Sequence, residues 1–474
     1  MSDVAENWWE DLPSLAGLCS MDRAMKAEWS VEESVERLKE LHFLLKRSAE
    51  ILTSHIPGEP IYELKMAYSH HAYLLSEHTT LIRHRVSEMR EPPLGLDKVP
   101  HAGLELLMNE LECLTDSAAF VIAFYGSCLP LYLRDVQRHL QDAHPLADAP
   151  TIRNLKWILV ELEEIDRFGQ VAVHAARSGV DVDWLGAWSA WFERWLEAME
   201  RTKSASDLSA TFPEPVASLT PFVIALEPRR DERFVDRFNA GVNPEAFLYD
   251  ETYPLQPKTL MMYYKRLREL DVPEMMATIL HELRHEEPWE FHREMIRQLW
   301  DEARHAMMGE VGFESVGVDW KQIPINFTWS RNLNMQLTAR ERHGVLFFIE
   351  QGLMPKTGKR FEWEVGMQSG DSLSGLFQDF DWADEVLHSQ IGRRWYVPKF
   401  ESLQKALDYG DRCWSKVLSH WEEYRDQGLT EHRNWWPDLY REACRRWGVE
   451  PDPKVLEFNV SYQAIRADLK EIQS

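Results

Sequence analysis

Two short segments of this chain repeat one pattern of side chains that could bind a metal ion. Residues 301–305 (DEARH) and 384–388 (DEVLH) both read Asp-Glu-x-x-His, and both lie in strongly helical stretches. Residues three apart share one face of a helix, so the glutamate and histidine of each segment point the same way. A carboxylate and an imidazole in this arrangement can ligate one transition-metal ion. A single pair of this kind is common on solvated helices, whereas two pairs in one half of a chain are much more specific.

The two motifs together predict a centre for two metal ions. Glu302 and His305 would come from one helix, and Glu385 and His388 from another. Two more helices, each supplying one glutamate, would complete the ligands of a ferritin-like di-iron carboxylate bundle. Four carboxylates neutralise two Fe(II) ions, and carboxylate with imidazole suits iron or manganese better than calcium or a thiolate zinc site. We therefore expect two iron ions, with an iron–manganese pair as the alternative.

The glutamate on the helix before the first motif can be selected by height along the helix. A turn is expected at Pro288. An antiparallel partner of Glu302 should lie as far before this turn as Glu302 lies after it, because both helices rise equally per residue. Glu274 meets this condition and is predicted as the ligand. Glu269, about five residues further from the turn, is the alternative, and Pro273 could kink the helix and change the count.

The remaining glutamate is predicted in the same way from the second pair of helices. A turn is expected at residues 369–371, with Asp371 as the N-cap of the following helix. Glu350 then falls near the height of Glu385. It also lies in an apolar run, where an unpaired carboxylate would cost several kcal/mol. Glu341 is the alternative ligand, but its arginine neighbours are typical of a solvated face.

Asp301 and Asp384 precede the two motif glutamates and lie one step around each helix from them. We expect both aspartates to accept hydrogen bonds from the ligand histidines and so to orient the imidazole rings. Two exposed aspartates on the helix surface are the alternative interpretation.

The fold class predicted from the whole chain is all-α, because almost every long segment shows helical periodicity and none shows a strand-and-hairpin pattern. We expect a ferritin-like four-helix bundle preceded by a second helical domain, which could be a degenerate bundle. A stretch rich in Ser, Ala, Thr and Pro at residues 203–217 is typical of a linker. The expected domains are residues 1–210, helical and without metal; 211–400, the metal-binding bundle; and 401–474, a helical extension packed on that bundle. The helices expected in the second half include residues 258–270, 274–286, 289–309, 334–351 and 371–395.

Composition narrows the classes of function. The chain has 474 residues, of which 44% are hydrophobic, and a formal net charge of −25, which disfavours nucleic acid as a partner. The five cysteines form no CxxC pair, so neither a disulfide framework nor a thiolate zinc site is expected. No run of eighteen apolar residues predicts a membrane span, and the first residues do not resemble a signal peptide. We expect a cytoplasmic protein.

The region from about residue 266 to residue 395 resembles an uncharacterised ferritin-like family related to di-iron tRNA-hydroxylating enzymes. In that family a DExxH helix is followed by a glutamate-containing helix that ends in a Gly-Leu break, here residues 350–353 (EQGL). A second DExxH motif then leads into an Ile-Gly-x-Arg-Trp run, here residues 384–395. The resemblance implies a ferritin-like di-iron site but no particular reaction. Pro273 departs from the straight helix usual in the family, and the acidic charge argues against a tRNA substrate.

The predicted function is a di-iron oxidase or oxygenase that activates O2 and acts on a small organic substrate beside an apolar wall near Phe347 and Phe348. No flavin or nicotinamide motif occurs, so an external electron donor is expected, and a homodimer is an open possibility. The alternative is a non-catalytic ferritin-like metal-binding or peroxide-scavenging protein. A substrate pocket with aromatic walls beside the metals would favour the enzyme, and a closed site would favour the alternative.

Overall fold

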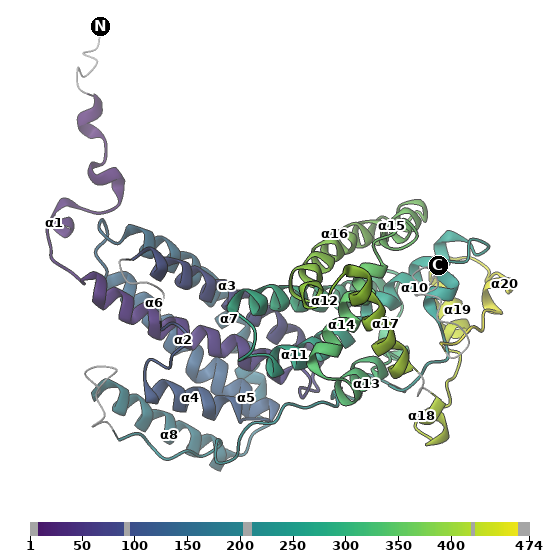
Figure 1. Ribbon diagram of the computed structural model, residues 1–474, viewed down its shortest axis with the longest axis horizontal. Coiled ribbons are helices and arrows are strands. Elements are labelled where there is room, and N and C mark those ends of the chain that lie inside the picture. The colour runs from purple at the N-terminus through teal and green to yellow at the C-terminus, as the bar shows by residue number, and fades with distance from the viewer. Residues whose placement is uncertain (1–7, 90–94, 202–210, 419–421, 463–474) are drawn as a thin grey trace, which may run out of the picture. The chain divides into compact units, whose positions relative to one another are not determined.

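The structure, a computed structural model, describes residues 8–89, 95–201, 211–418 and 422–462 (Figure 1). Every regular element among these residues is a helix and none of them forms a strand, which confirms the all-α prediction. The chain divides into two compact units. The first consists of residues 1–51 and 74–222, and the second of residues 52–73 and 223–474.

The first unit is built from long amphipathic helices. Two of them, α2 (Val31–His55) and α3 (Tyr62–Glu88), follow one another in the chain, and residues 52–73, where α2 ends and α3 begins, belong to the second unit. The other elements of this unit are η1 (Trp8–Asp11), η2 (Ser14–Gly17), α1 (Met21–Ala24), α4 (Ala102–Glu112), α5 (Ser117–Ala123), the π-helix η3 (Phe124–Cys128), α6 (Leu129–Asp142), α7 (Ala149–Ala176) and α8 (Val182–Arg201).

The continuous helical run through α5, η3 and α6 is long and apolar enough to cross a membrane, judged by length and composition alone. However, 61% of its most apolar window is buried inside the structure. That degree of burial is typical of a core helix in a soluble protein. The run is therefore weak evidence for a membrane span.

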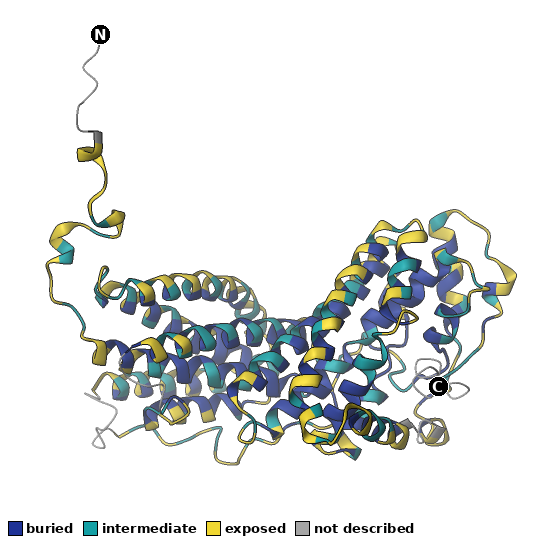
Figure 2. Ribbon diagram, turned by 45° about the horizontal axis from the view of Figure 1, so that its top comes forward, coloured by how far each residue is buried: buried dark blue, intermediate teal, exposed yellow. Residues whose placement is uncertain are grey.

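The second unit contains both Asp-Glu-x-x-His motifs. Among its described residues, buried faces of the helices turn inward and exposed faces turn outward (Figure 2). Its elements are α9 (Pro244–Leu248), α10 (Leu255–Arg268), α11 (Asp271–Glu282), α12 (Trp289–Ser315), η4 (Trp320–Gln322), α13 (Thr328–Gln336), α14 (Ala339–Gly352), α15 (Lys359–Gln368), α16 (Ser372–Trp395), η5 (Val397–Lys399), α17 (Leu403–Leu418), α18 (Glu422–Asp426), α19 (Trp436–Trp447) and α20 (Pro453–Leu456).

The helices predicted in this half are present with shifted ends. The segment predicted at residues 334–351 is two helices, α13 and α14, and α15 is a further helix that the sequence prediction does not contain. α10 and α11 are separated by a break, and Pro273 lies in the first turn of α11, where the missing amide proton of proline leaves no helical hydrogen bond unmade. The proline therefore starts a new helix instead of kinking a long one.

Side-chain caps fix where the helices of the motif region begin. Asp371 caps α16 by accepting hydrogen bonds from the backbone N–H groups of Leu373 and Ser374, which confirms its predicted role. Thr338 and Glu341 form a reciprocal capping box at the start of α14. Glu341, the alternative metal ligand of the sequence prediction, is thus occupied with the helix terminus.

α12 is the central helix of the motif region. It packs against α10, α11 and α16, while α14 packs against α11, α16 and α17, and α15 lies along α16 (Figure 1). Buried apolar side chains join α10 to α12, among them Tyr263, Leu267, Ala303 and Phe313. These contacts hold the end of α10 beside the first motif on α12.

The two predicted domain boundaries differ from the observed division. Residues 203–210 of the expected linker lie outside the described residues, and residues 211–217 contain no helix. Residues 52–73 belong to the second unit although they precede the linker by more than a hundred residues, and residues 401–474 belong to the same unit as the motifs. In the C-terminal region, α17 packs against α14, the helix that carries Glu350.

α10 and α12 approach so closely that one glycine is required between them. A Cβ at Gly309 would collide with the backbone nitrogen of Leu267 on α10. We expect Gly309→Ala to lower the free energy of unfolding by about 1–3 kcal/mol, because the backbone of α10 would have to move. Thermal unfolding followed by circular dichroism measures this change.

The matched control is Gly186→Ala on α8, where an added Cβ meets no atom within 4 Å. This change should be neutral or stabilising by up to about 1 kcal/mol, since alanine favours a helix over glycine. Equal effects of the two substitutions would contradict the proposed close approach of α10 and α12.

Candidate metal centre

Two groups of side chains in the second unit could each hold a metal ion. Within each group, ligand atoms from all four residues lie within 4.8 Å of one another. Glu385 belongs to both groups, so the groups are adjacent. The first group is Glu269, His305, Asp381 and Glu385, and the second is Glu302, Glu350, Glu385 and His388.

Most residues of both groups come from only two helices, α12 and α16, because their spacing places them on one face of each helix. Glu302 and His305 are three residues apart on α12, and both are buried. Asp381, Glu385 and His388 follow one another at four and three residues on α16, so they form one buried stripe along that helix. Glu350 comes from the last turn of α14, and Glu269 directly follows α10 as its C-cap residue.

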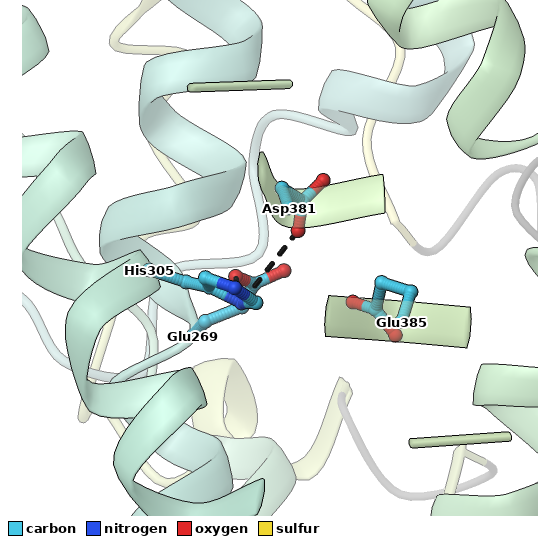
Figure 3. A group of neighbouring side chains, drawn as sticks. All are labelled: Glu269, His305, Asp381 and Glu385. Atoms are coloured by element: carbon cyan, nitrogen blue, oxygen red, sulfur yellow. Dashed lines mark ion pairs between the residues drawn. The ribbon is translucent and has the colours of Figure 1, made fainter. Parts of the chain in front are cut away.

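The first group surrounds the imidazole of His305 (Figure 3). Its Nδ1 lies 3.3 Å from Oε2 of Glu269 and 3.6 Å from Oδ1 of Asp381. In the figure the Asp381 carboxylate points toward the imidazole, and Glu385 lies one turn further along α16. The same nitrogen is 3.7 Å from Oε2 of Glu302, a member of the second group.

The second group surrounds the imidazole of His388. Its Nδ1 lies 3.2 Å from Oε1 of Glu302, 3.5 Å from Oε2 of Glu385 and 3.9 Å from Oε1 of Glu350. Gln298 donates a hydrogen bond of 3.2 Å to the same Glu350 oxygen. Glu302 therefore contacts both histidines, one with each carboxylate oxygen.

Each histidine is oriented by the aspartate of the opposite motif. His305 Nε2 donates to Oδ2 of Asp384 at 3.1 Å, and His388 Nε2 lies 3.4 Å from Oδ2 of Asp301. With Nε2 occupied in this way, Nδ1 of each ring faces the carboxylates, which is the orientation a metal ligand needs. Burial disfavours charge on Asp301, but His388 and Arg304 outweigh it and lower the pKa of Asp301 to about 2.

Two arginines hold both aspartates from the outside. Arg297 Nε lies 2.9 Å from Oδ2 of Asp301, and Arg304 Nη2 lies 2.8 Å from Oδ2 of Asp384 and also contacts Asp301. The Arg297 guanidinium in turn lies over the ring of Tyr73, 5.5 Å from its centre. The side chains behind the histidines are thus themselves fixed by ion pairs.

Two buried cations lie among the carboxylates of the first group. Lys359 Nζ is 2.9 Å from Asp381 Oδ1, 3.0 Å from Glu385 Oε1 and 3.9 Å from Glu269 Oε1. Arg266 contacts Asp381 and lies 2.8 Å from Glu269 Oε1. Both cations compensate carboxylate charge that would be costly to bury alone.

Glu350 and Glu385 have opposite protonation tendencies. Burial and the nearby charge of Glu385 raise the pKa of Glu350 well above its usual range. Burial also disfavours charge on Glu385, but the Lys359 ammonium and hydrogen bonds outweigh it and hold the pKa of Glu385 well below its usual range. A proton held by this pair therefore favours Glu350 over Glu385.

Several buried atoms at the middle of the two groups make no hydrogen bond to the described residues. Leaving such atoms unsatisfied costs about 1–3 kcal/mol each. A metal ion would satisfy them, because all are good donors to a cation such as iron, manganese or zinc. The residues present therefore fit a metal ion. The atoms are Oε2 of Glu269, Oε1 of Glu302, Oε2 of Glu385, and Nδ1 of His305 and of His388.

Glu274, the predicted first ligand, lies in neither group, and Glu269 occupies the position expected for it. Glu274 is fully buried in an ion pair with Lys65 and a bidentate one with Arg230. The predicted height was wrong because residues 283–288, the turn before α12, do not advance along a helix axis as helical residues do. Counted from the helix ends at that turn, Glu282 and Trp289, Glu269 and not Glu274 matches the height of Glu302.

Three residues near the groups were not singled out from the sequence. Asp381 precedes Glu385 by four residues, so its place on the ligand face of α16 could have been read from helical spacing. Arg266 precedes Glu269 by three residues, and this spacing is a weaker indication that the two side chains lie on the same face. Lys359 follows an irregular turn, and nothing in the local sequence indicates that its ammonium reaches the carboxylates of α16.

A cavity of about 130 Å³ adjoins the two groups. Carboxylates from both groups form part of its wall, together with Arg266 and Lys359. The remaining wall is partly apolar and aromatic. The apolar and aromatic residues are Val272, Trp329, Leu346, Ile349, Leu353, Trp414 and Tyr462.

The apolar wall expected at Phe347 and Phe348 is instead formed by their neighbours on α14. Leu346 and Leu353 lie four residues before and three residues after Glu350, which puts all three on one helix face. Phe347 points elsewhere and packs against Tyr396.

Comparisons of this chain with protein families, with curated proteins and with solved structures found no match. The chemistry and geometry of its own residues therefore carry the functional assignment.

The different surroundings of Glu269 and Glu274 lead to opposite expectations for two isosteric substitutions. Glu269→Gln should reduce bound metal at sub-saturating concentration by removing a charged ligand, with a small effect on stability. Glu274→Gln should retain the metal but lower the free energy of unfolding by about 3–5 kcal/mol, because Lys65 and Arg230 lose a buried counter-ion. Elemental analysis and denaturant unfolding measure the two effects, and metal loss only in Glu274→Gln would contradict the assignment.

Metal binding should release protons. Burial opposes protonation of His305, but its hydrogen bond to Asp384 and the nearby carboxylates of Glu269 and Glu302 raise its pKa to about 10. The pKa of His388 is raised well above its usual range against the same opposing effect of burial.

With a pKa of about 10, His305 is thus protonated at pH 7 in the metal-free protein, and a histidine must lose its proton to bind a metal. Calorimetric titration with a divalent metal in buffers of different ionisation enthalpy should report release of at least about one proton. Metal affinity should accordingly rise with pH. A pH-independent affinity with no proton release would contradict this protonation state.

Proposed function

We propose that α12 and α16, with α14 and the α10–α11 segment, form a ferritin-like four-helix bundle that holds two iron ions. The observation that carries this proposal is the position of Glu385, which belongs to both ligand groups. Glu385 would therefore help to hold both ions. Glu302, with one oxygen toward each histidine, would do the same.

The ligand chemistry favours iron. Each group combines one imidazole with carboxylates and contains no thiolate, which suits Fe(II) or Mn(II) and disfavours calcium and structural zinc. The five cysteines are all free, in keeping with a protein of a reducing cytoplasm. An iron–manganese pair is compatible with the same ligands.

We propose further that the protein is an oxidase or oxygenase acting on a small organic substrate. The bound ions would supply the redox chemistry with O2. Asp301 and Asp384 would keep both imidazoles turned toward the ions, and the apolar face of α14 would exclude water from the cavity. A cavity with aromatic walls beside the ligands favours an enzyme over a metal-storage or peroxide-scavenging protein, which needs no organic substrate site.

The proposed reactions also define the partners. In an oxygenase reaction, one oxygen atom of O2 enters a C–H bond of the substrate and the other leaves as water. Two electrons from an external donor and two protons balance this step. In an oxidase reaction, the substrate gives up two electrons and two protons, and O2 becomes hydrogen peroxide.

The decisive experiment is anaerobic loading with Fe(II), followed by elemental analysis and by optical spectra after O2 is added. We expect about two irons per chain in the wild type, with a transient visible band, and loss of both in Glu302→Ala/Glu385→Ala. Glu341→Gln is the matched control, because this glutamate caps α14 and lies in neither ligand group, so the iron content should be unchanged. Absence of stoichiometric iron in the folded wild type would overturn the proposal.

A further inference from the structure

The charges around the cavity define the kind of substrate that the proposed centre could accept. Five carboxylates belong to the two ligand groups, and two buried cations, Arg266 and Lys359, contact them. When two divalent ions bind and both histidines act as neutral ligands, five negative charges face six positive ones. One excess positive charge then remains in a site shielded from water, where an uncompensated charge is costly.

Neighbouring ion pairs do not remove this excess. Lys265 is paired with Glu362, and Arg297 and Arg304 are paired with Asp301 and Asp384. In each of these two sets, the numbers of positive and negative charges are equal. Arg268 and Glu245, which also belong to the cavity wall, form an ion pair with each other. Arg266 and Lys359 are thus the cations that join the cavity wall to the ligand carboxylates.

Arg266 has unused hydrogen-bonding capacity at this position. Its side chain is fully buried, and none of its three guanidinium nitrogens makes a hydrogen bond of good geometry to the described residues. It only lies against the carboxylates of Glu269, Glu362 and Asp381. Once metal ions draw Glu269 and Asp381 toward themselves, the planar guanidinium fork would lose two of its three carboxylate partners and keep only Glu362 at 3.8 Å. Such a fork matches the two oxygens of a carboxylate.

We propose that the metal-loaded centre binds a small organic carboxylate, with its head group between Arg266 and Lys359 and its apolar tail against Leu346, Ile349 and Leu353. The inference rests on the proposed di-metal function and names its substrate class. The size of the cavity, about 130 Å³, restricts the tail to a few carbon atoms. The apolar lining of α14 distinguishes an organic acid from an inorganic anion.

The test is a titration of the Co(II)-loaded protein with butyrate, followed by the visible Co(II) spectrum and by calorimetry. Butyrate should bind the loaded protein and not the metal-free protein, in which Arg266 and Lys359 keep their carboxylate partners. Butyramide, a neutral molecule of the same shape, should bind at least about tenfold more weakly. Acetate should also bind more weakly, because each buried CH2 contributes about fourfold.

Substitutions separate binding by these cations from simple coordination to the metal. Arg266→Gln and Lys359→Met should each weaken butyrate by about tenfold or more with Co(II) stoichiometry retained, and Arg266→Lys should restore most of the affinity. Arg360→Gln is the matched control, since Arg360 is the exposed neighbour of Lys359 on α15 and pairs with Glu364. It should leave the dissociation constant unchanged.

The possible failures are distinguishable. Absence of Co(II) binding would overturn the proposed metal function itself. Three results with normal Co(II) stoichiometry would leave the metal centre standing and overturn the carboxylate inference. They are no butyrate binding, equal binding of butyrate and butyramide, and unchanged binding in both Arg266→Gln and Lys359→Met. If Arg266→Gln fails to fold, Lys359→Met alone decides between these outcomes.

Discussion

Charge balance in a buried space is the constraint on which the rest of this structure depends. In the metal-free protein, the five carboxylates of the two ligand groups lie among four basic side chains: Arg266, Lys359 and two histidines whose pKa values are raised. The acidic and basic groups thus compensate one another in the buried site. Burial on this scale is tolerable only when every charge has a partner at short range, so each ligand helix must be held in register with the others.

The packing around α12 provides that register. Gly309 lets α10 approach closely enough for Glu269 to reach the ring of His305, and the cap at Asp371 fixes where α16 begins. The crossed pairing of each histidine with the aspartate of the other motif then ties α12 directly to α16. Apolar packing and polar pairing thus fix the same arrangement, which is a mark of a specified site.

A second buried ion network beside the centre has a different character. Its two acids and two bases neutralise one another, and no unsatisfied atoms point to a common point. The four residues are Glu274, Lys65, Arg230 and Asp271, and the Ser330 hydroxyl donates to both acids. This network joins the start of α3, through Lys65, to α11, so it stabilises the second unit. Unsatisfied atoms that converge are what distinguish the metal ligands from this structural network, although both consist of buried acids and bases.

The sequence by itself determined the features that depend on local spacing. These include the all-helical fold, the shared faces of the paired motifs and the cap at Asp371, because helical periodicity and capping are set by residues within one or two turns. It also brought Glu302, His305, Glu350, Glu385 and His388 into consideration together.

Only the tertiary structure decided that Glu269 and not Glu274 faces the motif, that Lys359 reaches α16, and that Leu346 and Leu353 line the cavity. These features depend on turns whose residues do not rise helically and on how separate helices pack, and neither is encoded in the spacing of residues along one helix.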